Sequence, residues 1–237
     1  MTTTQKKMIW AWPTRAFHWL LALGFISAYL LGENDNFRQF HFAFGALVGV
    51  LTVMRIFYGI IGPRYSRFRD FPISLRNQTA FVKSIFSKQN IYAGHNPLAS
   101  VVMLAIMIVG FLTAASGYIL YLNESQNTTS AGFYFPEEAH EVFANIFLVL
   151  VIFHLAGIFT DLLIHGKSGS FFSIFNGYKA VDTEDARPNL FQKTYGVLWI
   201  SLAVIVFFLA FSLPPLSGNS DRHNEKTGHE QSENDDD

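Results

Sequence analysis

The sequence predicts an all-α membrane protein, with a bundle of four transmembrane helices followed by a fifth. Half of the 237 residues are hydrophobic and only 15% are charged. The apolar residues gather in five runs of about 20 residues, the length that crosses a hydrocarbon core of about 30 Å. Almost no sequence remains between the runs for a soluble domain.

The five spans are expected at about 16–32, 39–61, 97–122, 137–165 and 195–213. A basic leader with Lys6 and Lys7 precedes the first span, and no small-residue cleavage site follows it, so we interpret this span as a retained helix rather than a signal peptide. Pro97 suits the first turn of the third span. Pro214 follows the last span and ends it.

The connection between the second and third spans is rich in Arg and Lys. Within 78–88, the apolar residues Phe81, Val82, Ile85 and Phe86 have helical spacing, and Lys83 and Lys88 lie elsewhere on the helical wheel. This pattern predicts an amphipathic helix lying on the membrane surface.

We divide the chain into a four-helix membrane domain at 1–190, an additional transmembrane helix at 191–213 and a disordered acidic tail at 214–237. Lys and Arg gather in the leader and in the second and fourth connections, whereas the first connection has only Arg38 and the third has none. By the positive-inside rule, the N-terminus is predicted to be cytoplasmic. Five spans then place the C-terminus on the outer side of the membrane.

Four histidines fall into two pairs by depth. His140 and His154 are fourteen residues apart on one span, so their rings face the same side about 21 Å apart along the axis. His41 begins the second span at the outer face, at the depth of His140. His18 begins the first span at the inner face, at the depth of His154.

Each histidine pair would hold a planar macrocycle between two helices, which predicts two b-type haems. Bis-histidine ligation suits electron transfer because no coordination position of the iron stays open for a substrate. The absence of cysteine excludes covalent c-type attachment, disulfides and cysteine-ligated iron–sulfur clusters. Structural zinc is disfavoured because it needs four ligands close together. Ordinary interfacial histidines are the alternative.

The neighbours of the histidines fit the same interpretation. Gly45 and Gly49 continue the stripe of His41, where small residues either leave room for a flat ring or allow close helix packing. Arg55 lies fourteen residues after His41, so it is expected at the depth of the inner pair. There it either binds a haem propionate or reaches back to the interface.

Two further arginines precede ligand candidates by three residues: Arg15 before His18, and Arg38 before His41. Each is a candidate for a propionate contact, and an ordinary interfacial arginine is the alternative.

Five segments then carry a family resemblance over most of residues 10–180: TRAFHWLLA (14–22), RQFHFAFGALVGVLTVMRIFYGIIGPRYSRFRDF (38–71), GHNPLAS (94–100), HEVFANIFLVLVIFHLAG (140–157) and FNGYK (175–179). In this order they resemble bacterial cytochrome b561 and the b-type cytochrome subunits of nickel–iron hydrogenases. The resemblance implies a four-helix core with two b haems, with His18, His41, His140 and His154 as axial ligands. The 60–71 segment is more similar to the hydrogenase-type branch.

The resemblance also implies a function in a respiratory chain. Members of the family move electrons between membrane quinone and a redox partner, here a periplasmic c-type cytochrome or a hydrogenase. The alternative is a self-contained superoxide:quinone oxidoreductase, which the acidic outer connections disfavour because its substrate is an anion. A membrane scaffold without haem is a third class. Lipid and quinone are expected partners, and nucleic acid is not.

The quinone site is expected at the cytoplasmic end, beside the inner haem. Reducing a quinone requires two protons from a titratable group within reach. His95, at the start of the third span, and Asp161, seven residues after His154, are the candidates. The structural alternatives are that His95 caps a helix and that Asp161 pairs with a loop lysine.

Overall fold

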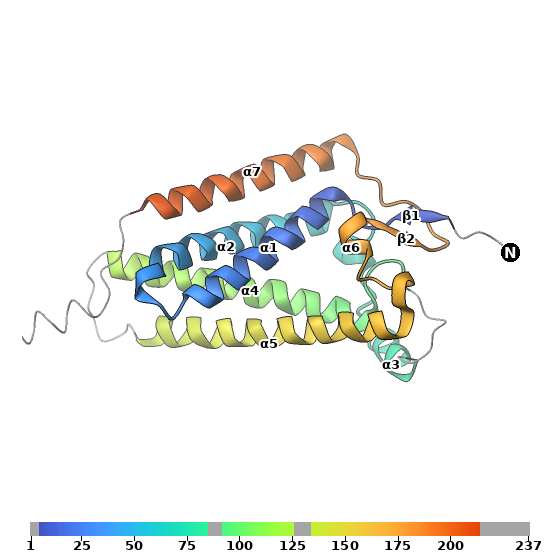
Figure 1. Cartoon of the computed structure of the whole chain (residues 1–237), viewed down its shortest axis with the longest axis horizontal. Coiled ribbons are helices and arrows are strands. Elements are labelled where there is room, and N and C mark those ends of the chain that lie inside the picture. The colour runs from blue at the N-terminus through green and yellow to red at the C-terminus, as the bar shows by residue number, and fades with distance from the viewer. Residues whose placement is uncertain (1–4, 85–91, 126–133, 214–237) are drawn as a thin grey trace, which may run out of the picture.

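A computed structural model describes residues 5–84, 92–125 and 134–213. Among these residues, five helices are long and apolar enough to span a membrane, as the sequence predicts: α1 (Trp12–Leu31), α2 (Arg38–Ile61), α4 (Pro97–Ser125), α5 (Tyr134–His165) and α7 (Leu190–Ser212). α7 and α5 lie on opposite sides of the bundle, with α1, α2 and α4 between them (Figure 1). The predicted tail at 214–237 lies outside the described residues.

Several short elements join the long helices: β1 (Lys6–Met8), η1 (Asp35–Phe37), η2 (Phe68–Asp70), α3 (Leu75–Lys83), η3 (Gly166–Ser168), α6 (Ser173–Asn176) and β2 (Tyr178–Ala180). All except η1 gather at one end of the bundle, which we call the strand end (Figure 1). There β1 and β2 pair antiparallel, with Lys6 opposite Ala180 and Met8 opposite Tyr178. The other end is called the far end.

The predicted surface helix is present as α3, which begins and ends earlier than expected. Ser74 caps it by accepting a hydrogen bond from the backbone N–H of Asn77. Leu75 and Val82 are exposed, as expected of a helix at a membrane surface. The predicted contributions of Ile85 and Phe86 lie outside the described residues.

Two spans, α1 and α7, begin four and five residues earlier than the hydropathy pattern predicts. α1 starts at Trp12 because Pro13 fits a first helical turn. α7 starts at Leu190 because Asn189 and Gln192 form a capping box, each side chain bonding the other residue's backbone N–H. The Gln192 amide also donates to the carbonyl of Ile61 at 2.8 Å, which ties the start of α7 to the end of α2.

The packing is centred on α2, which contacts α1, α4 and α7, whereas α5 lies along α4. One core cluster joins α1, α2 and α7: Phe17, Leu47, Leu51, Tyr58, Trp199 and Ala203. A second cluster lies toward α5: Phe25, Val48, Ile106 and Phe147. The outward side of α5 carries exposed apolar side chains, among them Val149, Phe153 and Leu163.

Replacing Trp199 with alanine should loosen α7 from the bundle. Trp199 is 1% exposed and stacks on Phe17 with ring centres 5.3 Å apart, so its removal leaves a cavity and should lower the free energy of unfolding by about 3 kcal/mol. The control is Phe208→Ala on the same helix, where the side chain is 62% exposed. Thermal unfolding in detergent is the measurement. Equal melting temperatures for the two variants would contradict the assignment of Trp199 as the anchor.

Candidate functional site

Four histidine rings form two pairs, each joining α5 to another helix. The ring centres of His41 and His140 are 5.9 Å apart, and those of His18 and His154 are 6.3 Å apart. Two imidazoles that bind opposite sides of one metal ion through metal–nitrogen bonds of about 2 Å have ring centres about 6 Å apart. The structure therefore brings together the pairs expected from helical depth, at a spacing that suits a shared iron.

The pair at the far end is fixed by hydrogen bonds across helices. His41 Nδ1 lies 2.7 Å from the carbonyl oxygen of Ala28, and His140 Nδ1 lies 3.0 Å from that of Thr113. Because a carbonyl only accepts, Nδ1 of each ring carries a proton. In a neutral ring, Nε2 then keeps its lone pair, the tautomer in which histidine binds a metal.

Two glycines make room for these rings. A Cβ added at Gly117 would lie 2.9 Å from Cε1 of His140, and one added at Gly32 would lie 3.2 Å from Nδ1 of His41. Gly49, by contrast, allows close packing, since an added Cβ would lie 3.0 Å from that of Ala114. The role of Gly32 was not predicted, because it follows α1 and only the fold brings it to His41.

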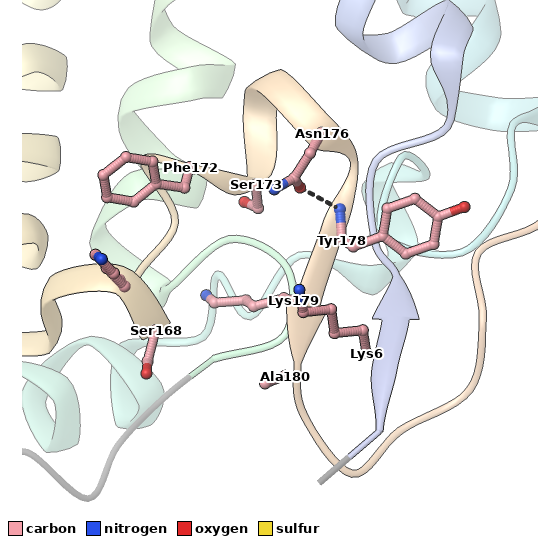
Figure 2. A pocket seen from close by; sticks show the side chains of 9 residues that line it. Lys6, Ser168, Phe172, Ser173, Asn176, Tyr178, Lys179 and Ala180 are labelled. Carbon is pink, nitrogen blue, oxygen red and sulfur yellow. Dashed lines mark hydrogen bonds between the residues drawn. The ribbon is translucent and has the colours of Figure 1, made fainter.

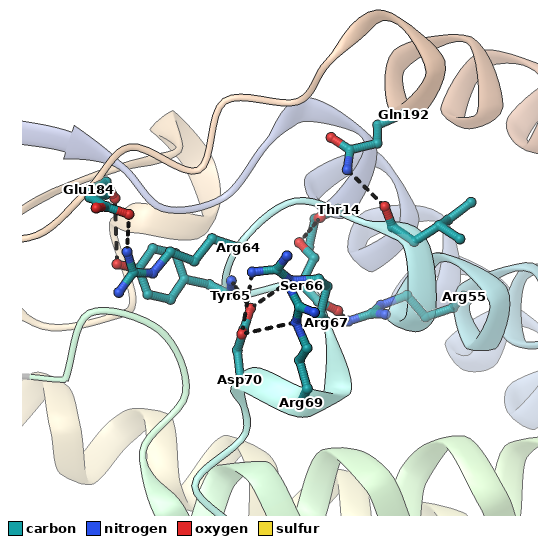
Figure 3. A network of polar contacts seen from close by, with 11 residues as sticks. Thr14, Arg55, Arg64, Tyr65, Ser66, Arg67, Arg69, Asp70, Glu184 and Gln192 are labelled. Carbon is teal, nitrogen blue, oxygen red and sulfur yellow. Dashed lines mark hydrogen bonds and ion pairs between the residues drawn. The ribbon is translucent and has the colours of Figure 1, made fainter.

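At the strand end, Arg55 lies inside the bundle rather than at the interface. It is 2% exposed and lies between the rings of Phe17 and Phe68, 5.8 and 5.6 Å from their centres. Nη2 donates to the carbonyl of Ser66 at 3.0 Å (Figure 3), and Nη1 is buried with no partner among the described residues. A buried guanidinium with a free donor is a ready partner for an anion.

The loop after α2 holds Arg55 in place by folding back over the strand end. The hydroxyls of Ser66 and Thr14 are 2.8 Å apart, which links this loop to α1. Asp70 accepts from the backbone N–H of Tyr65 and from Nε of Arg67 at 3.0 and 3.1 Å, which closes the turn (Figure 3).

The other two arginine candidates lie at opposite ends. Arg15 donates through Nη1 to the carbonyl of Phe175 at 2.6 Å, and its Nε is buried with no partner among the described residues. It lies beside the turn at Gly177, which has a φ of 87°. A Cβ added there would lie 2.8 Å from the Trp10 carbonyl oxygen, so a side chain is excluded. Arg38 begins α2 at the far end, one turn before His41.

His95 lies at the strand end between two aromatic rings. Its ring centre is 4.8 Å from those of Trp10 and Phe71, and its Nδ1 is buried without a partner among the described residues. Burial, and then the charge of Arg55, lowers the pKa of His95 to about 3. The ring therefore is neutral at pH 7 and borders a cavity of about 190 Å³ that Phe71 and Tyr92 also line.

Asp161 lies at the end of α5 and is not brought against His95. Its carboxylate accepts from Nδ1 of His165 at 2.9 Å and from the backbone N–H of Ser170 at 2.5 Å, so it holds the turn that follows the helix. Lys179 interacts electrostatically with both Asp161 and His95. Its ammonium donates to the carbonyl of Tyr92 at 2.6 Å.

Lys179 is the strand-end residue whose role sequence reasoning missed. It is 5% exposed, and burial lowers its pKa while Asp161 opposes that shift. The one sequence signal for such a role was its position in the segment FNGYK, two residues after Gly177. A lone lysine at that position is equally typical of a solvent-exposed loop.

Burial of His95 should make stability depend on pH. Because its folded pKa lies below the unfolded value of 6.5, the unfolded chain binds the extra proton, and stability is lost as pH falls from about 6.5 toward 3. Lowering pH from 7 to 5 should cost about 2 kcal/mol through this residue. The variant His95→Phe keeps an aromatic ring between Trp10 and Phe71. It should remove this pH-dependent part of the free energy of unfolding. Denaturant unfolding at both pH values measures it, and identical pH slopes in the two proteins would disprove it.

Known proteins share these features. The model of the prokaryotic cytochrome b561 family matches residues 9–177. The chain is 24% identical over 152 residues to the probable Ni/Fe-hydrogenase 1 B-type cytochrome subunit of Escherichia coli K12, covering 53% of this chain and 65% of that protein. It is 27% identical over 146 residues to the probable Ni/Fe-hydrogenase B-type cytochrome subunit of Bradyrhizobium diazoefficiens, covering 50% and 58%.

The matched region spans less than two thirds of each of these relatives. No solved structure matches the chain. The family match covers more than half of the sequence and includes all four paired histidines. The chain therefore belongs to the prokaryotic cytochrome b561 family and is a multi-pass membrane cytochrome of the b type, with electron transfer as its general function.

Proposed function

We propose that this cytochrome holds two b haems and passes electrons between the quinone pool and a redox partner. The main support is the arrangement of the histidines, which form two pairs with ring centres about 6 Å apart, each spanning two helices. In this proposal His41 and His140 ligate one iron, and His18 and His154 ligate the other. Each haem supplies reversible one-electron chemistry, and two histidines leave its iron no open position for a substrate.

The surrounding residues fit such a group. A Cβ added at Gly45 or at Gly157 would meet no atom within 4 Å, so there is room for a flat ring beside His41 and beside His154. The buried donors Arg55 Nη1 and Arg15 Nε lack partners among the described residues, and the two propionates of the strand-end haem would satisfy them. Arg38 would serve the haem at the far end.

Phe147 separates the two haem positions. It lies seven residues from both His140 and His154 on α5, packs on Phe25 with ring centres 4.3 Å apart, and faces Gly110 of α4. This packing keeps the middle of the bundle apolar, so the residues that carry charge stay at the two ends.

We place the strand end in the cytoplasm and the far end in the periplasm. Arg and Lys gather at the strand end on the leader, the loop after α2 and the connection after α5, in agreement with the positive-inside rule. The redox partner would then dock at the periplasmic face. The names of the relatives favour a hydrogenase, and a periplasmic c-type cytochrome is the other candidate.

We place the quinone site at the strand end, with His95 and Asp161 as the proton-exchanging groups. His95 borders the cavity beside Phe71 and Tyr92, which would hold the quinone ring, and α3 presents apolar residues to the membrane near it. Asp161 would lie further out, hydrogen-bonded to Nδ1 of His165. In the same proposal, residues 1–190 form the haem domain and 191–213 an additional helix, which the family match does not include.

Replacing one ligand should remove one haem. The purified protein should contain two b haems per chain, and His140→Ala or His18→Ala should contain one, because each haem depends on its own pair. His165→Ala, a histidine outside both pairs, should keep two. Pyridine haemochrome analysis against protein concentration measures the ratio. A wild-type ratio of one, or loss of both haems in each single variant that still folds, would contradict the independent pairs.

Quinone turnover should depend on His95. His95→Ala should slow quinol-driven haem reduction in membranes by about 100-fold or more, the usual contribution of a general acid or base, while both haems remain bound. Asp161→Asn should reduce the rate less and change its pH dependence. Stopped-flow absorbance measures both. If both variants keep the wild-type rate and pH profile, the quinone site lies elsewhere, with the far-end haem as the next position to test.

A further inference from the structure

A lysine-rich pocket of about 290 Å³ opens at the strand end, where the end of α5 meets α6 and the two strands (Figure 2). Three lysines line it, Lys6, Lys167 and Lys179, together with the polar residues Ser168, Ser173 and Asn176. The lining includes no carboxylate. The pocket plays no part in the electron transfer proposed above.

Among the described residues, the carboxylate of Asp161 partly offsets the charge of Lys179, but Asp161 does not line the pocket. The ion pairs of the described residues include none of the three lysines. Lys179 is nearly buried, and its ammonium donates to the Tyr92 carbonyl at 2.6 Å and to Oγ of Ser170 at 3.1 Å. An ammonium has three N–H donors, so one remains for a ligand. The pocket therefore has the charge and the donors to bind an anion.

The pocket lies at the depth of the membrane interface. The ring centres of Phe175 on α6 and Trp19 on α1 are 4.9 Å apart. Trp19 lies in the second turn of this spanning helix. Phe172 and Tyr178, which line the pocket, are exposed together with Phe175. Exposed aromatic rings at this depth are typical of the lipid headgroup region, so the bound anion should come from a lipid rather than from solution.

We propose that this pocket binds the phosphate headgroup of an anionic phospholipid, with Lys6, Lys167 and Lys179 around the phosphate and Phe172 against the first part of an acyl chain. Basic pockets beside transmembrane helices recognise anionic headgroups in this way. The lipid would fasten α6 and the strands to the membrane. Ser173, in the pocket lining, accepts from Nε1 of Trp10 at 3.0 Å, so the lipid would also steady the ring that covers His95.

The experiment uses the full-length cytochrome in phosphatidylcholine nanodiscs or detergent, titrated with phosphatidylglycerol. Retained lipid is counted by native mass spectrometry, and the lipid concentration that gives half of the thermal stabilisation is measured. The double variant Lys6→Gln/Lys167→Gln should need about tenfold more phosphatidylglycerol. Lys6→Arg/Lys167→Arg should bind as the wild type does. The matched control is Lys193→Gln, an exposed lysine in the first turn of α7 at the same end.

Three outcomes would overturn the proposal. An equal loss in Lys193→Gln would mean diffuse attraction to the whole basic surface. Stabilisation by inorganic phosphate with no phosphatidylglycerol retained would mean a site for free phosphate. No difference between wild type and the glutamine double variant, with haem absorbance showing both to be folded, would mean that the lysines bind no lipid.

Discussion

The far end of the fold depends on how buried imidazole nitrogens are satisfied inside a membrane. A ring N–H in hydrocarbon must have an acceptor, and backbone carbonyls within a helix are already bonded to their own turn. His41 and His140 meet this constraint with bonds from Nδ1 to second lone pairs on Ala28 and Thr113. These bonds fix α2 against α1 and α5 against α4. They also leave both Nε2 atoms outside these hydrogen bonds.

The two histidine pairs have different surroundings at the two ends of the bundle. The far-end pair is held by carbonyls, whereas the strand-end pair lies beside two buried cations, Arg55 and Lys179, and the neutral ring of His95. Asp161 offsets part of the charge of Lys179, and one donor of Arg55 has no partner among the described residues. Such a cluster would be unfavourable in an apolar bundle unless an anion is present. Haem propionates would supply that anion within the bundle, and a lipid phosphate would supply it at the surface. β1 in the leader pairs with β2 in the connection after α5. This pairing joins the two segments that enclose the cluster.

Sequence periodicity was sufficient for the features that depend on one helix at a time. The five spans and the two histidine depths follow from hydropathy and from the fourteen-residue step between His140 and His154. Contacts between distant segments could not be predicted in this way. Three-residue strands have no usable period, and the position of His95 between Trp10 and Phe71 requires three separate segments to meet. The capping box that starts α7 was visible in the sequence, but the apolar run placed the start later.

The fifth helix has a physical role that the family pattern, which ends at residue 177, does not include. Arg55 and Tyr58 lie one turn apart on α2, and both are buried. The rings that cover Tyr58 come from α7, with Tyr195 stacked at 5.9 Å and Trp199 at 5.8 Å. Lipid in their place would bring hydrocarbon close to a guanidinium, at a large cost in free energy. α7 therefore covers Tyr58, the residue one turn after Arg55 on α2.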